Sequence, residues 1–347
     1  MPYLSYNKRK IRIERGGTGA TEQQVRDLQR DLRQLGYLKS GIDGKFGKAT
    51  ETAVKALQFD LLHNDGRSTR NDGKAPVSVL DLNRGRVVAI TGSVAQGLAS
   101  CISDMLDEPN FPSLPKADDP KAENNKIIGL MKEMPSEEVP IPFVMAILQQ
   151  ESGLKHYNVP SKNDEDTYIV IGLDTNASEK HIITSRGYGA GQYTLFHHPP
   201  KKEEVEDFML DVAKNLRKAV GELREKFDHF VNGGTSGTRA GDRIAEHGSG
   251  PLRLCRYPAE DPRFMKDCKQ CMEDAGQQKI KERVTPIYQG SSFKFVPTDY
   301  YRSGSYDSVP IRKNVPCDWP YAARRYNGAG INSYHYQTIV LRNVLNL

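Results

Sequence analysis

The residue of this chain best suited to chemistry is a glutamate near the end of an apolar segment. Residues 140–157 read Pro-Ile-Pro-Phe-Val-Met-Ala-Ile-Leu-Gln-Gln-Glu-Ser-Gly-Leu-Lys-His-Tyr, and their apolar side chains recur at helical spacing. Pro140 and Pro142 are typical of a helix start, and Gly153 is typical of a helix end. We therefore expect Glu151 in the last turn of a buried helix.

This position predicts an acid that holds its proton. The partial negative charge at a helix C-terminus and low-dielectric surroundings both raise the pKa of a carboxyl group such as that of Glu151. A carboxylic acid that stays protonated near neutral pH can protonate the leaving oxygen in glycoside cleavage. The alternative is a helix-end glutamate that points into solvent.

Three motifs follow one another along the C-terminal two thirds of the chain. They are Ala-Ile-Leu-Gln-Gln-Glu-Ser-Gly at 146–153, Gly-Tyr-Gly-Ala-Gly-Gln-Tyr at 187–193 and Arg-Tyr-Asn-Gly-Ala-Gly at 325–330. In this order they resemble the catalytic-helix, Gly-Leu-Met-Gln and Ala-Tyr-Asn-Ala-Gly motifs of soluble lytic transglycosylases and goose-type lysozymes. The resemblance implies a mainly α (α+β), lysozyme-like catalytic domain with a small β-hairpin region.

The resemblance also implies roles for individual residues. Glu151 would be the general acid. The substrate-binding residues would be Ser152, Gln192, Tyr193, Tyr326 and Asn327. In the second motif Ala190 and Gly191 replace the family's Leu-Met, which preserves the backbone turn but not the apolar contacts.

The N-terminal part of the chain has the pattern of a compact helical module. Thr21 followed by Gln24 fits a capping box, and leucines at helical spacing follow up to residue 35. Residues 21–60 resemble the three-helix peptidoglycan-binding domain of cell-wall hydrolases. Its ligand-binding residues would be Asp43, Gly44 and Phe46. Residues 61–83 are polar and rich in glycine, so the third helix is expected later, at 84–106.

These patterns predict a linear arrangement of parts. Residues 1–17 form a basic arm, 18–107 the peptidoglycan-binding domain, 108–125 a proline-rich linker and 126–347 the catalytic domain. One long helix is expected at 203–231.

An acidic segment follows the Glu151 helix. Residues 167–174 and 181–184 are β-branched and apolar, which predicts a hairpin with a turn near Asn176. Among the acids there, Asp174 at the end of the first strand is our candidate for a second catalytic carboxylate. An inverting lysozyme would need it about 6.5–9.5 Å from the acid. The alternative is a solvated turn acid.

The cysteines and histidines leave several interpretations open. Cys268 and Cys271 have C-x-x-C spacing, and disulfides, plain thiols and a zinc site all remain candidates for the set. The five cysteines are Cys101, Cys255, Cys268, Cys271 and Cys317. His197 and His198 favour a turn over a metal site. No metal ion or cofactor is assigned.

Composition limits the class of partner. The 347 residues carry a net charge of +5, which suits an anionic polymer such as the glycan strands of a cell wall but is not typical of nucleic-acid binding. No apolar run has the length of a membrane span, and the N-terminus lacks the apolar core of a signal peptide. Either a signal peptide was removed before this numbering, or the protein crosses a membrane by another route. A wall-binding module and a muramidase without a signal peptide suit action in the bacterial periplasm or cell wall after phage lysis (an endolysin) or after delivery by a secretion system (an antibacterial effector). An effector would require an immunity protein that blocks the cleft.

The resulting functional hypothesis is a peptidoglycan hydrolase, a muramidase that cleaves the β-1,4 bond between N-acetylmuramic acid and N-acetylglucosamine. One alternative is a lytic transglycosylase, which forms 1,6-anhydro ends with the same glutamate and without a second carboxylate. Others are a non-catalytic wall-binding protein and a chitinase-like enzyme.

Overall fold

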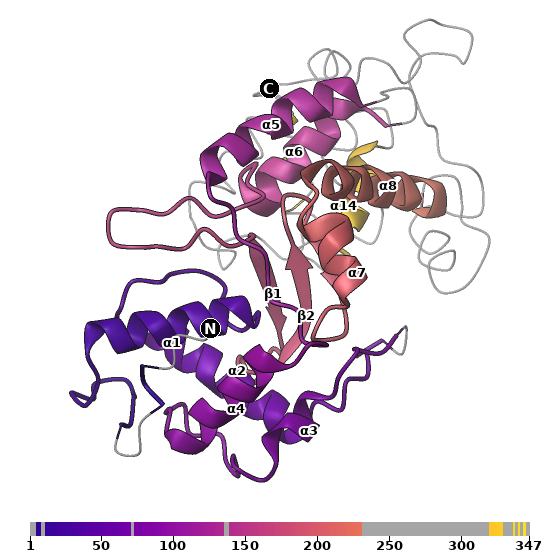
Figure 1. Ribbon diagram of the computed structural model, residues 1–347. Coiled ribbons are helices and arrows are strands. Elements are labelled where there is room, and N and C mark those ends of the chain that lie inside the picture. The colour runs from indigo at the N-terminus through magenta and orange to yellow at the C-terminus, as the bar shows by residue number, and fades with distance from the viewer. Residues whose placement is uncertain are drawn as a thin grey trace, which may run out of the picture. The chain divides into compact units, whose positions relative to one another are not determined.

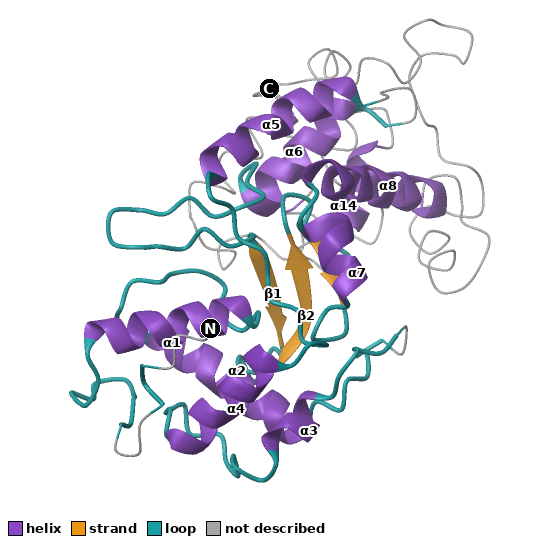
Figure 2. Cartoon of the chain, viewed as in Figure 1, coloured by secondary structure: helices purple, strands orange, loops and turns teal. Residues whose placement is uncertain are grey.

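The computed structural model describes residues 5–7, 11–70, 73–134, 139–230, 319–328, 336, 339–340 and 343–344. The chain forms two compact units. Unit 1 contains Met1–Ile127 and Lys155–Leu216, and unit 2 contains Ile128–Leu154 and Arg217–Leu347. Figure 1 shows the elements in chain order, and Figure 2 shows that helices predominate. Within the described residues, no helix combines the length and apolar character needed to cross a bilayer.

Unit 1 begins with two packed helices, α1 (Glu22–Gln34) and α2 (Lys48–His63). The predicted capping box starts α1, because the Thr21 hydroxyl accepts from the Gln24 amide at 3.2 Å and the Gln24 side chain accepts from the Thr21 amide at 2.9 Å. The apolar face of each helix is buried in one shared core. The prediction of a compact helical module is confirmed in this part of the chain.

Two further helices complete this core, α3 (Val79–Asn83) and α4 (Gln96–Asp107). The helix expected at 84–106 therefore begins later than predicted, at Gln96. Arg84 ends α3 in the left-handed conformation at φ 49°, and the Asn83 side chain bonds both backbone groups of Val87. The backbone after α3 is thus committed to loop hydrogen bonds, and the second helix begins twelve residues later. Figure 1 shows α1 to α4 gathered together.

Residues 108–125 pack into unit 1, which differs from the linker that the prolines suggested. The Leu114 amide donates to the Gln34 carbonyl at 2.9 Å, and the Ile169 amide donates to the Pro115 carbonyl at 2.9 Å. Leu114 is buried, and helix α5 (Pro120–Glu133) begins within the same stretch. Backbone hydrogen bonds to Gln34 and to Ile169 hold this segment in place, so it is not a free linker despite its prolines.

A small antiparallel sheet of three strands, in the order β1-β2-β3, follows in unit 1. Its strands are β1 (Ile171–Thr175), β2 (Ile183–Tyr188) and β3 (Tyr193–Leu195). The predicted hairpin is confirmed as β1 and β2. The third strand, only three residues long, was not predicted.

One face of the β1–β2 hairpin docks on the helical module. Arg186 of β2 donates to the Gly36 carbonyl at 3.1 Å and pairs with Asp60 of α2 at 3.3 Å. Side chains alternate along a strand, so the residues two positions from Arg186 lie on the same face as Arg186. The residues next to Arg186 in the chain face away from the helical module.

The helix expected at 203–231 is interrupted. A short helix α7 (Lys202–Glu204) leads into a π-helical turn, η1 (Val205–Met209), and α8 (Val212–Phe230) follows. Two side chains contact the carbonyls at the interruption, since Asn215 of α8 donates to that of Phe208 at 3.2 Å and His156 Nε2 lies 2.9 Å from that of Met209. A π-type turn of this kind often marks a place where a side chain enters the helical ladder.

Unit 2 is built on the glutamate helix α6 (Ile141–Ser152). Pro140 is its N-cap and Gly153, at φ 64°, its left-handed C-cap, so both predicted boundaries are confirmed. Helix α14 (Trp319–Tyr326) contacts α6, and the Trp319 ring stacks on Phe227 of α8 at a centroid distance of 4.1 Å.

Candidate active site

Glu151 lies in the last turn of α6, as the sequence predicts, and its side chain is half-buried. The hydroxyl of Tyr336 donates a hydrogen bond of 2.6 Å to its Oε1. A bond of this length is short for an O–H···O contact and fixes the position of Oε1. The carboxyl group is thus held in a defined orientation inside unit 2.

Two tyrosines form an aromatic wall beside the carboxyl group. The rings of Tyr326 and Tyr336 lie nearly parallel, with centroids 6.5 Å apart and an interplanar angle of 9°. Burial raises the pKa of both phenols well above the ordinary value, and the negative charge of Glu151 raises it further. The phenols therefore stay protonated at neutral pH, and Tyr336 remains a hydrogen-bond donor.

The sequence reasoning missed Tyr336. The motif at 325–330 directed attention to Tyr326, whereas the hydrogen bond to Glu151 comes from a residue ten positions later. The run Tyr-His-Tyr at 334–336 was the available signal. It did not indicate which ring would reach the carboxyl group. Glu222 of α8 was missed too, and its charge contributes to the raised pKa of Tyr326.

The other predicted residues of unit 2 lie at helix ends. The Ser152 hydroxyl donates to the Leu148 carbonyl of its own helix at 3.1 Å. Asn327 follows α14 and is exposed, with its backbone amide donating to the Arg324 carbonyl at 3.2 Å. Their roles toward a substrate stay predictions.

Gln192 and Tyr193 belong to unit 1, where Gln192 ends the turn that joins β2 to β3 and Tyr193 begins β3. Gln192 adopts φ 50°, and its Nε2 donates to the Gly189 carbonyl at 2.7 Å. The ring of Tyr193 packs edge-on against Phe208 at 4.8 Å. The turn expected from the second motif is therefore present, and its glutamine side chain folds back over the turn.

Asp174 also lies in unit 1, near the end of β1, and is exposed. Its Oδ2 accepts a hydrogen bond of 2.7 Å from the hydroxyl of Ser185, its cross-strand partner. This placement matches the predicted position at a strand end. A catalytic role for this carboxylate stays a prediction.

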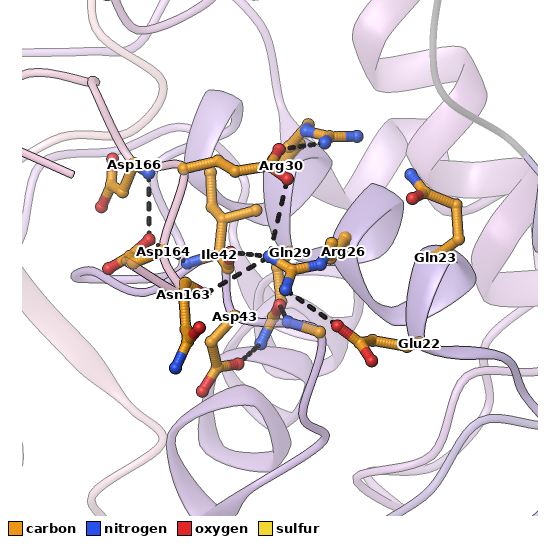
Figure 3. A network of polar contacts seen from close by, with 12 residues as sticks. Glu22, Gln23, Arg26, Gln29, Arg30, Ile42, Asp43, Asn163, Asp164 and Asp166 are labelled. Carbon is orange, nitrogen blue, oxygen red and sulfur yellow. Dashed lines mark hydrogen bonds and ion pairs between the residues drawn. The ribbon is translucent and has the colours of Figure 1, made fainter. Parts of the chain in front are cut away.

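The Asp43 loop between α1 and α2 is closed by one buried glutamine. The Gln29 side chain donates to Asp43 at 2.9 Å and accepts from the Gly44 amide at 2.8 Å (Figure 3). Partial burial would raise the pKa of Asp43, but the hydrogen bonds from Gln29 and the Lys45 amide outweigh it, and the pKa is lowered. Phe46 is half-buried against the core of the module. The structure thus uses Asp43, Gly44 and Phe46 to shape the loop, and Gln29 is a further residue that the sequence reasoning missed.

A second segment of unit 1 is joined to this loop through a polar network. Asp164 accepts from the Ile42 amide at 2.7 Å, and Arg26 donates to the Ile42 carbonyl at 2.8 Å (Figure 3). Deeper in the unit, the guanidinium of Arg33 and the carboxylate of Asp166 form a fully buried ion pair at 2.9 Å. Residues 163–166 therefore fold together with the helical module.

The histidine pair has structural contacts. His197 lies 3.0 Å from Glu204, and the buried ring of His198 packs edge-on against Tyr37 and Phe111. Of the cysteines, Cys101 is buried as a free thiol in α4, and the remaining four lie outside the described residues. In the described part of the chain, no group of three or more His, Cys, Asp or Glu is arranged to hold a metal ion.

Comparison with known families identifies one of these regions. Residues 21–61, which carry α1, the Asp43 loop and most of α2, match the model of the peptidoglycan-binding domain family. The chain therefore carries a peptidoglycan-binding domain, which indicates association with the cell wall. Searches of curated proteins and of solved structures gave no significant match.

Proposed function

We propose that this protein is a peptidoglycan hydrolase that cleaves the bond between N-acetylmuramic acid and N-acetylglucosamine, with Glu151 as general acid. The observation that carries the proposal is the hydrogen bond of 2.6 Å between Tyr336 and Glu151 at the end of a buried helix. A general acid must be held in one orientation toward the leaving oxygen, and a protonated phenol provides that restraint.

The peptidoglycan-binding domain supports the choice of substrate. A domain that associates with the cell wall raises the local concentration of glycan strands around the rest of the chain. The polar side chains assigned to substrate binding, Gln192 and Asn327, suit the hydroxyl and acetamido groups of such strands.

Two outcomes start from the same proton transfer. In a lysozyme, a second carboxylate activates water or attacks the sugar, and Asp174 is the candidate named from the sequence. In a lytic transglycosylase, the deprotonated Glu151 takes a proton from the 6-hydroxyl of the muramic acid, and a 1,6-anhydro end forms. The proposal favours hydrolysis because the acidic hairpin supplies carboxylates.

Mass spectrometry of fragments released from purified peptidoglycan tests the proposal. Reducing muramic acid ends establish a lysozyme, and their release should be greatly reduced in Asp174→Asn. Anhydro ends establish a transglycosylase and remove Asp174 from the reaction. The absence of released fragments overturns the enzymatic proposal in favour of a wall-binding protein without catalysis.

A further inference from the structure

We propose that Gly172 is a positioning residue for glycan binding, because the absence of a side chain there lets the carboxamide of Gln192 lie in one orientation toward an amino-sugar chain. The inference rests on the proposed function for its choice of ligand. We call the residues that hold this carboxamide the Gln192 seat: Gly172, Gly187, His156 and Asn215, all of which belong to unit 1. It assigns to β1, outside the 187–193 motif, a part in glycan recognition.

The floor of the seat is a pair of glycines. Gly172 of β1 and Gly187 of β2 are cross-strand partners, and they lie on the hairpin face opposite to Arg186. A Cβ atom placed on Gly172 would lie 2.3 Å from Oε1 of Gln192, and one on Gly187 would lie 3.1 Å from the same atom. The carboxamide therefore rests directly on backbone, where any side chain would displace it.

The backbone of the turn is fixed from behind by two buried polar side chains. His156 Nδ1 accepts from the Ala190 amide at 3.3 Å, and Asn215 Oδ1 accepts from the Gly191 amide at 2.8 Å. A Cβ on Gly189, at φ 71°, would lie 2.6 Å from the His156 ring. The turn that carries Gln192 is thus closely packed and held in one conformation.

Asn215 and His156 are themselves anchored. The Asn215 amide nitrogen donates to the carbonyls of Tyr188 at 2.9 Å and Phe208 at 3.2 Å. His156 Nε2 lies 2.9 Å from the Met209 carbonyl. Both side chains are fully buried, and each contacts the turn through one polar atom and a backbone carbonyl through another.

The seated carboxamide keeps hydrogen-bonding capacity. One N–H of Nε2 is used by the Gly189 carbonyl, and Oε1 of Gln192 accepts no hydrogen bond from the described residues. A primary amide has two N–H donors and an oxygen with two lone pairs, so a donor and an acceptor remain side by side. The hydroxyl and acetamido groups of an amino-sugar chain can fill both. Pre-orientation of the carboxamide lowers the entropic cost of binding.

The test is a double-mutant cycle between Gly172→Ala and Gln192→Ala. It uses the full-length chain with Glu151→Gln, titrated calorimetrically with the tetrasaccharide of N-acetylglucosamine. Among the described residues, the only heavy atoms within 4 Å of a Cβ on Gly172 belong to the end of the Gln192 side chain, so the variant should fold normally. Gly221→Ala is the matched control, because no atom of the described residues outside its own helix backbone lies within 4 Å of a Cβ there.

We expect each single substitution to weaken binding by about fivefold to tenfold, the loss of one or two hydrogen bonds. Adding Gly172→Ala to Gln192→Ala should change the affinity by less than about twofold, because the two act through one carboxamide. The inference would be overturned if the losses of affinity from Gly172→Ala and Gln192→Ala multiplied in the double variant, or if Gly172→Ala alone left the affinity unchanged. It would also be overturned if the parent chain did not bind the tetrasaccharide. The parent chain could bind the tetrasaccharide and show this coupling while the chain with Glu151 releases no fragments from peptidoglycan. That result would contradict the proposed hydrolysis but would support the role of Gly172.

Discussion

The phenol oxygen of Tyr336 lies 2.6 Å from Oε1 of Glu151. A donor at this distance restrains both the position and the rotation of the carboxyl group. Because burial raises the pKa of Tyr336, and a charge on Glu151 raises it further, the hydroxyl keeps its proton at neutral pH. We regard Tyr336 as the residue that positions the general acid.

Replacing this phenol by an apolar ring should separate positioning from packing. In Tyr336→Phe the ring is retained and the hydrogen bond is lost, so kcat should fall by about tenfold or more while KM changes little. Tyr157→Phe is the control, since the bond that this hydroxyl makes among the described residues is a long one of 3.4 Å to the Met209 carbonyl. Equal rates in the two variants, measured by release of soluble fragments from peptidoglycan, would show that the Tyr336 hydroxyl has no part in the reaction.

The buried ion pair between Arg33 and Asp166 gives a prediction about folding. The side chains are 0% and 1% exposed, and they join the peptidoglycan-binding domain to residues 155–216. Asp166→Asn leaves a buried guanidinium without its counter-charge, so the free energy of unfolding should fall by about 3 kcal/mol or more. Glu165→Gln, next to it but half-exposed, should change it by less than about 1 kcal/mol. Urea unfolding measures both, and similar values would mean that the pair does not hold these segments together.

Two buried histidines predict acid sensitivity of unit 1. Burial lowers the pKa of His156 from 6.5 to about 4, although Glu123 and Asp211 oppose this shift, and burial lowers that of His198 well below its usual value. The folded state keeps His156 neutral, whereas the unfolded chain binds a proton below pH 6.5. The stability contributed by this histidine is therefore full above pH 6.5 and lost as the pH falls toward 4.

The magnitude for His156 is about 3 kcal/mol over that range. Free energies of unfolding should be measured in urea at pH 7, 5.5 and 4.5. Since carboxyl groups also titrate there, the comparison is with His156→Gln, which should be less stable at pH 7 and should lose less stability on acidification. The same pH dependence in both proteins would contradict the assignment.

Gly44 provides a test of the Asp43 loop. It adopts φ 76°, and a Cβ atom there would lie 2.4 Å from Cγ of Glu22. Gly44→Ala should therefore lower the free energy of unfolding by about 1–3 kcal/mol. It should also weaken sedimentation with purified peptidoglycan. Gly129→Ala, inside α5, meets no atom of the described residues outside its own helix backbone within 4 Å and should bind like the parent without loss of stability. Equal binding by both variants would show that the shape of this loop does not matter for the wall.

The sequence predicted the elements whose signals are local. The capping box at Thr21, the two ends of α6 and the β1–β2 hairpin all follow from residues within a few positions of one another. The position of Glu151 in a last helical turn could be predicted for the same reason. The presence of a wall-binding module could also be predicted from the sequence, because its loop carries a specific run of glycines and an aspartate.

Long-range pairing is what the sequence did not reveal. The packing of residues 108–119 depends on amides and carbonyls of Gln34 and residues 167–169, far away in the chain. The hydrogen bond from Tyr336 to Glu151 joins residues 185 positions apart. At the interruption before α8, His156 from a distant part of the chain lies 2.9 Å from the Met209 carbonyl. None of these contacts has a pattern that could be read within one segment.

The central claim concerns the carboxyl group of Glu151, and one substitution tests it most directly. Glu151→Gln keeps the size and the hydrogen-bonding capacity of the side chain but cannot donate the proton that cleavage requires. We predict that this variant binds purified peptidoglycan like the parent and releases soluble fragments at least about a hundredfold more slowly. Gln149→Glu, exposed on the same helix, should release them at the parental rate. Undiminished release by a folded Glu151→Gln chain would contradict the account.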